Sequence, residues 1–199
     1  MPKEQWEAVA TEAMRRMYED PFWEARFGER GRKYALEDGL HHLGYLDAAL
    51  TADNAGVLVQ YAQWLRAVLV PRGMCSLHLV ENFARIGEVL AERGMDVDGR
   101  ARRFLGQACE ALRHVDGIDE TRVVREATLL VPAAAHELRV LVSYLGDAVA
   151  LDDPTVFRLY LAWARPWYAQ WGMDAEALLS ALRTSLAGAA PLAARMMDP

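Results

Sequence analysis

Cysteine is scarce in this sequence, and the two that occur, Cys75 and Cys109, form neither a CxxC pair nor a Cys/His spacing typical of zinc sites. Their scarcity excludes a disulfide framework and a structural zinc finger. The sequence also lacks an apolar run of 18 residues, and its first 20 residues carry acids throughout instead of the apolar segment of a signal peptide. We therefore expect a cytoplasmic protein with no membrane span and reduced thiols.

Clusters of positive charge are missing as well. The chain has 22 Lys and Arg against 28 Asp and Glu, a net charge of −6, and Glu29 interrupts its densest basic stretch. Nucleic acids and anionic membranes are bound by dense basic surfaces, so neither is an expected partner. A small-molecule ligand, a partner protein or a second copy of the chain remains as the expected partner.

Motifs of known enzyme classes are absent too. The sequence has no G-x-S-x-G, no glycine-rich phosphate loop and no cysteine with a histidine at a recognised catalytic spacing. No catalytic residue is predicted, and the pattern favours a protein that is not an enzyme.

What the sequence does have is an internal repeat. Tyr45–Met74 and Tyr144–Met173 align without a gap at an offset of 99 residues and share 10 of 30 positions, four of which are Tyr or Trp. Average residue usage would give roughly two identities. We interpret the repeat as a duplication.

Each copy has the pattern of a helix, a short break, a second helix and a glycine stop. Apolar residues recur at three- and four-residue spacing on both sides of "TADN" and "LDDP", which supply helix-capping residues. Further amphipathic segments precede and follow each copy, through Trp6–Met17 and Leu79–Leu90 in the first half and Phe104–Val115 and Leu178–Leu186 in the second. Sustained strand-like alternation is absent.

The predicted fold is therefore all-α: a roughly four-helix unit duplicated into two packed bundles of about eight helices. The two repeats would span residues 1–95 and 96–199, with the polar stretch Glu92–Arg100 as the hinge, and they either form separate cores or fuse into one body.

Aromatic residues indicate one kind of candidate site. Pro166 replaces Ala67 of the first copy and is expected to kink or shorten its helix, which would redirect Trp167 and Trp171. An aromatic-lined pocket for a flat ligand such as a tetrapyrrole would draw on Trp64, Trp163, Trp167 and Trp171. The alternative is that the matched pair, Trp64 and Trp163, anchors the core.

Polar residues indicate another. On a helix, Tyr34, Asp38, His41 and Tyr45 would share one face, while His42 would join the apolar stripe. Together with His78 and Glu81, the Asp38 and His41 side chains form the basis of an alternative hypothesis, a bundle-type metal-dependent oxidoreductase. The competing interpretation is that these are ordinary His/acid pairs at helical spacing.

The two copies also carry a family resemblance. Their consensus, Y-L-x-x-A-[LV]-x-x-x-D-[DN]-[AP]-x-[VF]-x-x-x-Y-x-x-W-x-R with a glycine stop, resembles the helical cap regions that accompany cobalamin-binding domains in bacterial sensors and methyl-transfer proteins. The stretch Arg26–Leu46 looks like the lead-in to such regions. The resemblance implies a corrinoid as ligand, with His41, His42 and Trp64 facing it. The chain lacks the Asp-x-His-x-x-Gly loop and the α/β domain that hold the corrinoid in that family.

Together these patterns favour a non-enzymatic helical module that binds a small ligand, such as a tetrapyrrole or corrinoid, or a partner protein in a regulatory role. The metal-dependent oxidoreductase and a scaffold or dimerisation unit are the alternatives.

Overall fold

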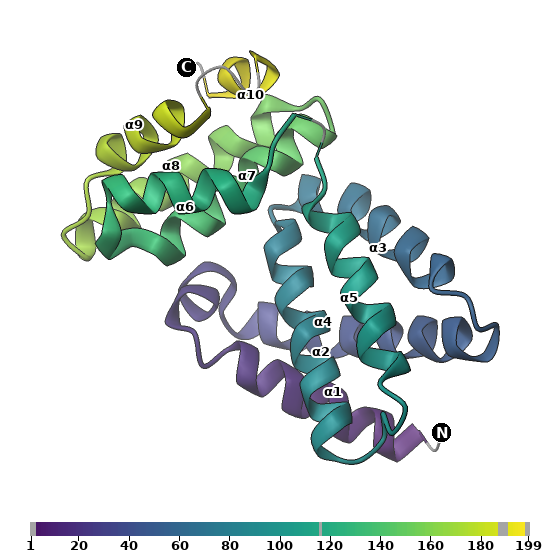
Figure 1. The fold of residues 1–199 in the computed structure, drawn as a ribbon. Helices are drawn as coiled ribbons and strands as arrows, with labels where there is room; N and C mark the ends of the chain where they lie inside the picture. The colour runs from purple at the N-terminus through teal and green to yellow at the C-terminus, as the bar shows by residue number, and fades with distance from the viewer. Residues whose placement is uncertain (1–2, 116, 187–190, 198–199) are drawn as a thin grey trace. The chain divides into compact units, whose positions relative to one another are not determined.

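The computed structural model describes residues 3–115, 117–186 and 191–197, and in this part of the chain the regular elements are helices. Figure 1 shows their arrangement. They are α1 (Lys3–Met17), α2 (Pro21–Thr51), α3 (Gly56–Leu69), α4 (Ser76–Glu92), α5 (Arg100–Arg113), α6 (Glu120–Leu130), α7 (Ala135–Ala150), α8 (Pro154–Gln170), α9 (Ala175–Leu186) and α10 (Pro191–Met196), with short 3-10 turns at Val70–Arg72 and Pro132–Ala134. The predicted all-α fold is confirmed.

Local sequence explains where the helices begin. The side chains of Asp20, Asp119 and Asp153 each accept a backbone N–H from the first turn of α2, α6 and α8, which satisfies a donor that has no partner inside the helix. Pro154 is the first residue of α8, a position at which proline is favoured. Within the described residues, none of the helices combines the length and the apolar character needed to cross a membrane.

The two copies of the repeat fold into helix pairs with the same turn. Asp53 and Asp152 both adopt a positive φ, 48° and 51°, and the next residue in each copy donates its backbone N–H to the carbonyl four positions before that aspartate, over 2.9 Å. Gly73 and Gly172 also have positive φ, where glycine carries no steric cost. The predicted helix, break, helix and glycine stop are present in both copies; duplication of whole four-helix units stays a prediction.

Two details depart from the sequence prediction. Helix α6 was not predicted; of its apolar residues, Val123 and Ala127 are buried, whereas Leu129 and Leu130 are exposed. Of the two effects expected of Pro166, an early helix end does not occur, since α8 continues to Gln170, and the kink stays a prediction.

The chain forms two compact units. Unit 1 comprises Met1–Trp64 and His78–Ala111, and unit 2 comprises Leu65–Leu77 and Leu112–Pro199. The predicted repeats, 1–95 and 96–199, concern sequence relationship and stay a prediction. The spatial units follow other bounds, because most of α5 packs in unit 1.

Each unit has its own apolar core. In unit 1, α1 packs on α2, and buried side chains include Leu43, Leu46, Leu58, Phe83 and Ile86. In unit 2, α7 contacts α6, α8 and α10, and α9 covers α6 (Figure 1). Helix α7 is buried along most of its length, from Val140 to Val149, so its polar residues Ser143 and Asp147 lie inside unit 2.

Candidate functional site

The predicted polar face of α2 lies at the surface. Tyr34 and Tyr45 are 46% and 44% exposed, His41 is exposed, and Asp38 is half-buried. Burial raises the pKa of Asp38, and the nearby His41 opposes that shift. The four residues share a helix face as predicted, but that face is exposed to solvent and does not form an enclosed polar site.

His42 is in the core of unit 1, as its place in the apolar stripe predicted. Its ring is 2% exposed, its Nδ1 lies 2.9 Å from the hydroxyl oxygen of Tyr61, and Phe83 contacts it edge-on at 4.9 Å between ring centroids. Burial, and then the nearby His78 and His41, lowers the pKa of His42 to about 3. His42 is therefore a neutral core residue with a hydrogen-bond partner.

His78 is equally buried but differs in its surroundings. It is 3% exposed, and neither Nδ1 nor Nε2 has a hydrogen-bond partner among the described residues. Three aromatic rings surround it, those of Trp23 at 4.9 Å, Phe27 at 5.1 Å and Tyr18 at 6.3 Å between centroids. Burial lowers the pKa of His78 to about 3, so its imidazole is neutral at physiological pH.

Two neighbours of His78 also have polar atoms without partners. The hydroxyl of Tyr18 and the Oδ1 of Asn82 are buried and make no hydrogen bond within the described residues. Asn82 lies one turn after His78 on α4, and its amide nitrogen donates a hydrogen bond to the sulfur of Met17, at 3.9 Å. We call Tyr18, Trp23, Phe27, His78 and Asn82 the His78 cluster.

The predicted metal ligands do not come together. Within the described residues, no group of three or more His, Cys, Asp or Glu side chains could hold a metal ion. His78 lies among aromatic rings, Glu81 accepts a hydrogen bond from Trp23 Nε1 at 2.7 Å, and His41 is exposed. The geometry of these side chains therefore does not form the predicted dimetal site and does not support the oxidoreductase alternative.

The predicted aromatic residues form rows along the helices. In unit 1, Tyr45 stacks on Tyr61 at 3.7 Å, and Trp64 follows at 6.1 Å. In unit 2 the matching row of Tyr144, Tyr160 and Trp163 continues through Trp167 to Trp171, with ring centroids 3.9 to 6.2 Å apart.

These rows correct the expectation that the matched tryptophans anchor the core. Trp64 is 57% exposed and Trp163 is partly exposed, whereas the tyrosines beneath them, Tyr61 and Tyr160, are buried. The predicted helical spacing is present, but it places the indole rings on the outer side of the stack.

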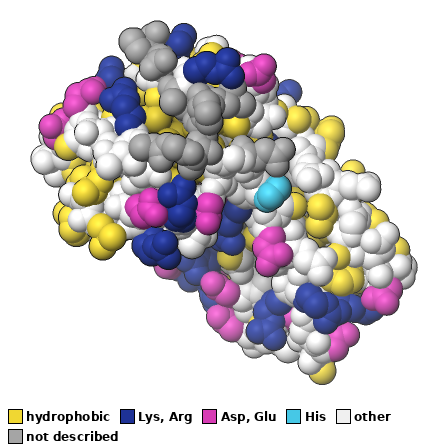
Figure 2. Space-filling model, turned by 45° about the horizontal axis from the view of Figure 1, so that its top comes forward, with side chains coloured by type: hydrophobic (Ala, Val, Ile, Leu, Met, Phe, Trp, Pro, Cys, Tyr) yellow, Lys and Arg dark blue, Asp and Glu magenta, His cyan; other side chains and the backbone are white. Residues whose placement is uncertain are grey.

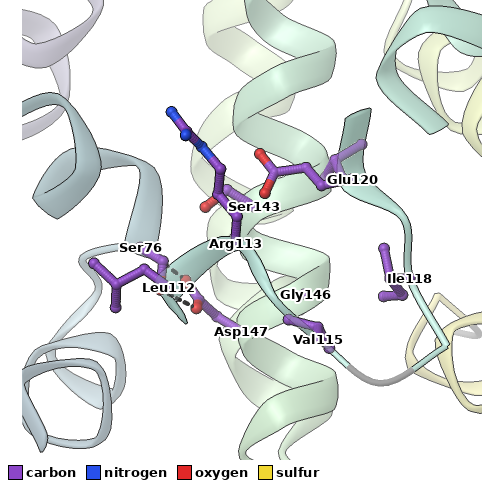
Figure 3. Close-up of a pocket in the computed structure, with 10 residues that line it drawn as sticks. Ser76, Leu112, Arg113, Val115, Ile118, Glu120, Ser143, Gly146 and Asp147 are labelled. Carbon is purple, nitrogen blue, oxygen red and sulfur yellow. Dashed lines mark hydrogen bonds between the residues drawn. The ribbon is translucent and has the colours of Figure 1, made fainter. Parts of the chain in front are cut away.

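A small pocket lies within unit 2 (Figure 3). Its lining consists of Ser76, Leu112, Arg113, Val115, Ile118, Glu120, Val142, Ser143, Gly146 and Asp147. Its free volume is about 10 Å³, room for about one water molecule. A tetrapyrrole or any drug-sized ligand is far too large for it.

Asp147 links three segments beside this pocket. Its carboxylate accepts the backbone N–H of Ser76 at 2.7 Å and the Ser76 hydroxyl at 2.5 Å (Figure 3). It also pairs with Arg66 Nε at 3.2 Å. One turn earlier on α7, Ser143 accepts the backbone N–H of Leu77. Two side chains of α7 thus satisfy N–H groups at the start of α4, where the helix dipole favours a negative charge.

Burial raises the pKa of Asp147 to about 6, although Arg66 and Ser76 favour the charged form. Burial also raises the pKa of Glu120, with Arg113 opposing the shift. Shifted carboxyl groups in a pocket can indicate a functional site. Here the polar atoms of Asp147 are bonded within the protein and the space is that of one water, so the pocket is a structural joint.

Comparison with known proteins adds no assignment, since no family model, no curated protein and no solved structure matches this chain. The candidate site therefore depends on the geometry of the chain itself. The His78 cluster is the strongest candidate, because it brings together four buried polar atoms that have no hydrogen-bond partner among the described residues.

Proposed function

We propose that this protein is a non-enzymatic binding module that takes up a small ligand in unit 1, at the His78 cluster. The supporting observation is a set of four buried polar atoms that make no hydrogen bond to any described residue: Tyr18 Oη, His78 Nδ1, His78 Nε2 and Asn82 Oδ1. Leaving such an atom unpaired costs about 1–3 kcal/mol, and the large majority of buried side-chain polar atoms in native proteins have a partner. A ligand that pairs with them would recover that free energy.

The chemistry of the cluster describes the ligand. A neutral imidazole offers one donor and one acceptor, the Tyr18 hydroxyl offers both, and the Asn82 oxygen accepts. The rings of Trp23 and Phe27 offer flat apolar contacts. The cluster therefore suits an uncharged, flat molecule that both donates and accepts hydrogen bonds.

A metal-bearing tetrapyrrole or corrinoid is the second form of this proposal. The neutral imidazole of His78 is the protonation state that coordinates a metal, and both of its nitrogens lack hydrogen bonds. On this geometry His78, rather than His41, His42 or Trp64, would hold such a group, and the surrounding aromatic rings would shield it from water.

A partner protein is the other candidate ligand, and exposed apolar residues favour it. Leu129, Leu159 and Trp171 of unit 2 are 77%, 62% and 60% exposed. Figure 2 shows apolar side chains among charged ones on the face it presents. A scaffold or dimerisation role would depend on Leu129, Leu159 and Trp171. Light scattering over a range of protein concentrations would detect self-association.

The decisive experiment is ligand binding to the full chain and to His78→Leu. Native mass spectrometry detects any molecule that copurifies, and absorption titrations use haemin, hydroxocobalamin and metal-free protoporphyrin IX as probes. Protoporphyrin separates ring binding from coordination, because it has the flat ring without a metal. His41→Leu is the matched control, since His41 is an exposed histidine of the same unit.

The proposal predicts a copurified molecule or a bound probe that His78→Leu removes and His41→Leu retains. If nothing copurifies and no probe binds, or if binding survives His78→Leu unchanged, the His78 cluster is not the ligand site.

A further inference from the structure

The chain that covers His78 is a separate short segment. Helix α2 is interrupted at Gly28, whose φ of 58° and ψ of −157° are not helical. Only glycine adopts this conformation readily. The residues before it, Pro21–Phe27, which we call the cover segment, are joined to α1 by a turn at Tyr18–Asp20 and to the rest of α2 by Gly28.

The cover segment supplies two of the rings that enclose His78. Trp23 is 0% exposed, Phe27 is partly exposed, and their rings stack at 5.9 Å. Tyr18, at the start of the turn, provides the third ring. The remaining aromatic neighbours of unit 1, such as Phe83 and Tyr61, pack on His42 instead.

Polar contacts connect the cover segment to the rest of unit 1. Trp23 Nε1 donates a hydrogen bond to Glu81 Oε2 on α4, at 2.7 Å. Glu24 pairs with Arg32 across Gly28, also at 2.7 Å, but both side chains are more than 40% exposed, where an ion pair adds little stability. The Trp23–Glu81 bond is thus a polar link between the cover segment and the helix that carries His78.

A second glycine, Gly31, allows Tyr18 and Phe27 to approach the backbone of α2 closely. A methyl group at Gly31 would lie 2.6 Å from the hydroxyl oxygen of Tyr18 and closer still to Cβ of Phe27. The covered arrangement thus depends on one glycine for its backbone angle and on another for its close approach.

From these contacts we infer that the cover segment is a lid: Pro21–Phe27 pivots about Gly28 and, when its Trp23–Glu81 bond opens, admits a ligand to His78. This inference rests on the proposed function, since it explains how a ligand reaches a histidine that is 3% exposed. On this inference, the structure described above is the closed state, and opening of the lid controls the access of a ligand to His78.

The test measures how fast His78 reacts with diethyl pyrocarbonate in the full chain without ligand, by peptide mass spectrometry near pH 7. This reagent modifies neutral, accessible imidazoles. Exposed His41 serves as the reference for reagent activity, and His42, buried under Tyr61 and Phe83, reports opening of the whole core.

Gly28→Ala is the principal variant, and Gly44→Ala is its matched control. Both glycines lie in α2 and a Cβ at either meets no atom within 4 Å, but only Gly28 has a positive φ. Gly28→Ala thus penalises the closed backbone without a clash, and should raise the His78 rate relative to His42 by roughly tenfold. Trp23→Phe keeps an aromatic ring but removes the N–H, and should raise the same ratio severalfold.

A His78 rate that is unchanged in both Gly28→Ala and Trp23→Phe would overturn the lid. So would a His78 rate that rises only together with that of His42, because it would report loss of the core. Since no ligand is present in this experiment, a failed lid and a failed ligand site give separate results.

Discussion

At the residue scale, two buried histidines of one core differ in whether their nitrogens are bonded. His42 has Tyr61 as a partner, whereas both nitrogens of His78 have none among the described residues. A buried polar group that has a partner supports the fold, and one without a partner weakens it. The two residues should therefore respond oppositely to the same substitution.

We predict that His78→Leu raises the free energy of unfolding at pH 7 by about 1–2 kcal/mol, because it removes two unpaired polar atoms. His42→Leu should lower it by about 1–2 kcal/mol, because it leaves the Tyr61 hydroxyl unpaired in the core. Urea unfolding followed by circular dichroism measures both. If the two variants destabilise the protein equally, His78 contributes to the stability of the fold as His42 does. That result would contradict the idea that His78 lowers stability and is retained for ligand binding.

At the element scale, α8 contains a proline that the helix tolerates. Pro166 lacks the N–H that would bond to the carbonyl four residues earlier, yet α8 continues to Gln170. Its side chain is exposed, so little packing would be lost on replacing it. The matching residue in the first copy is Ala67, in a helix that contains no proline.

We predict that Pro166→Ala raises the thermal stability of the protein, with a gain of about 1–3 kcal/mol from the restored hydrogen bond and helix propensity. The unfolded-state entropy that proline removes reduces this gain. Ala67→Pro is the reciprocal variant and should destabilise. Calorimetry on both would check this, and a loss of stability in Pro166→Ala would indicate that the proline shapes the aromatic row Trp163, Trp167 and Trp171.

At the scale of the whole molecule, the two units should respond oppositely to acid. In unit 1 the pKa values of His42 and His78 fall from 6.5 to about 3 on folding. The unfolded chain then binds more protons than the folded one between these values, so unit 1 loses stability as the pH falls below about 6.5. The raised pKa of Asp38 offsets part of this loss.

In unit 2 the stability changes with pH in the opposite direction. The pKa of Asp147 rises from 3.8 to about 6, so the folded state binds more protons between these values, and that contribution to stability grows as the pH falls from about 6 to 4. Glu120, whose pKa burial also raises, acts in the same direction.

We therefore predict a partly folded state near pH 4, in which unit 1 has opened and unit 2 keeps its helices. Hydrogen exchange followed by mass spectrometry at pH 7 and pH 4, corrected for the intrinsic exchange rate, would show lost protection in α1 and α2 but not in α7 and α8. Simultaneous loss of protection in both units would contradict it, and His78→Leu should move the opening of unit 1 to lower pH.

The sequence by itself determined the elements of this protein. Helical spacing of apolar residues, capping aspartates and glycine stops act over one or two turns, so the all-α fold, the paired turns at Asp53 and Asp152 and the burial of His42 followed from local patterns. Helix α6 escaped prediction because its burial depends on α7 and α9, which pack on it from elsewhere in the chain.

Only the tertiary structure decided which side chains meet. Trp23 and His78 lie 55 positions apart, and Ser76 and Asp147 lie 71 apart. No periodicity within one helix encodes such a pair, because it depends on how separate helices pack. For that reason the predicted site residues Tyr34, His41 and Tyr45 proved to be surface residues, while the His78 cluster and the Asp147 joint emerged only from the fold.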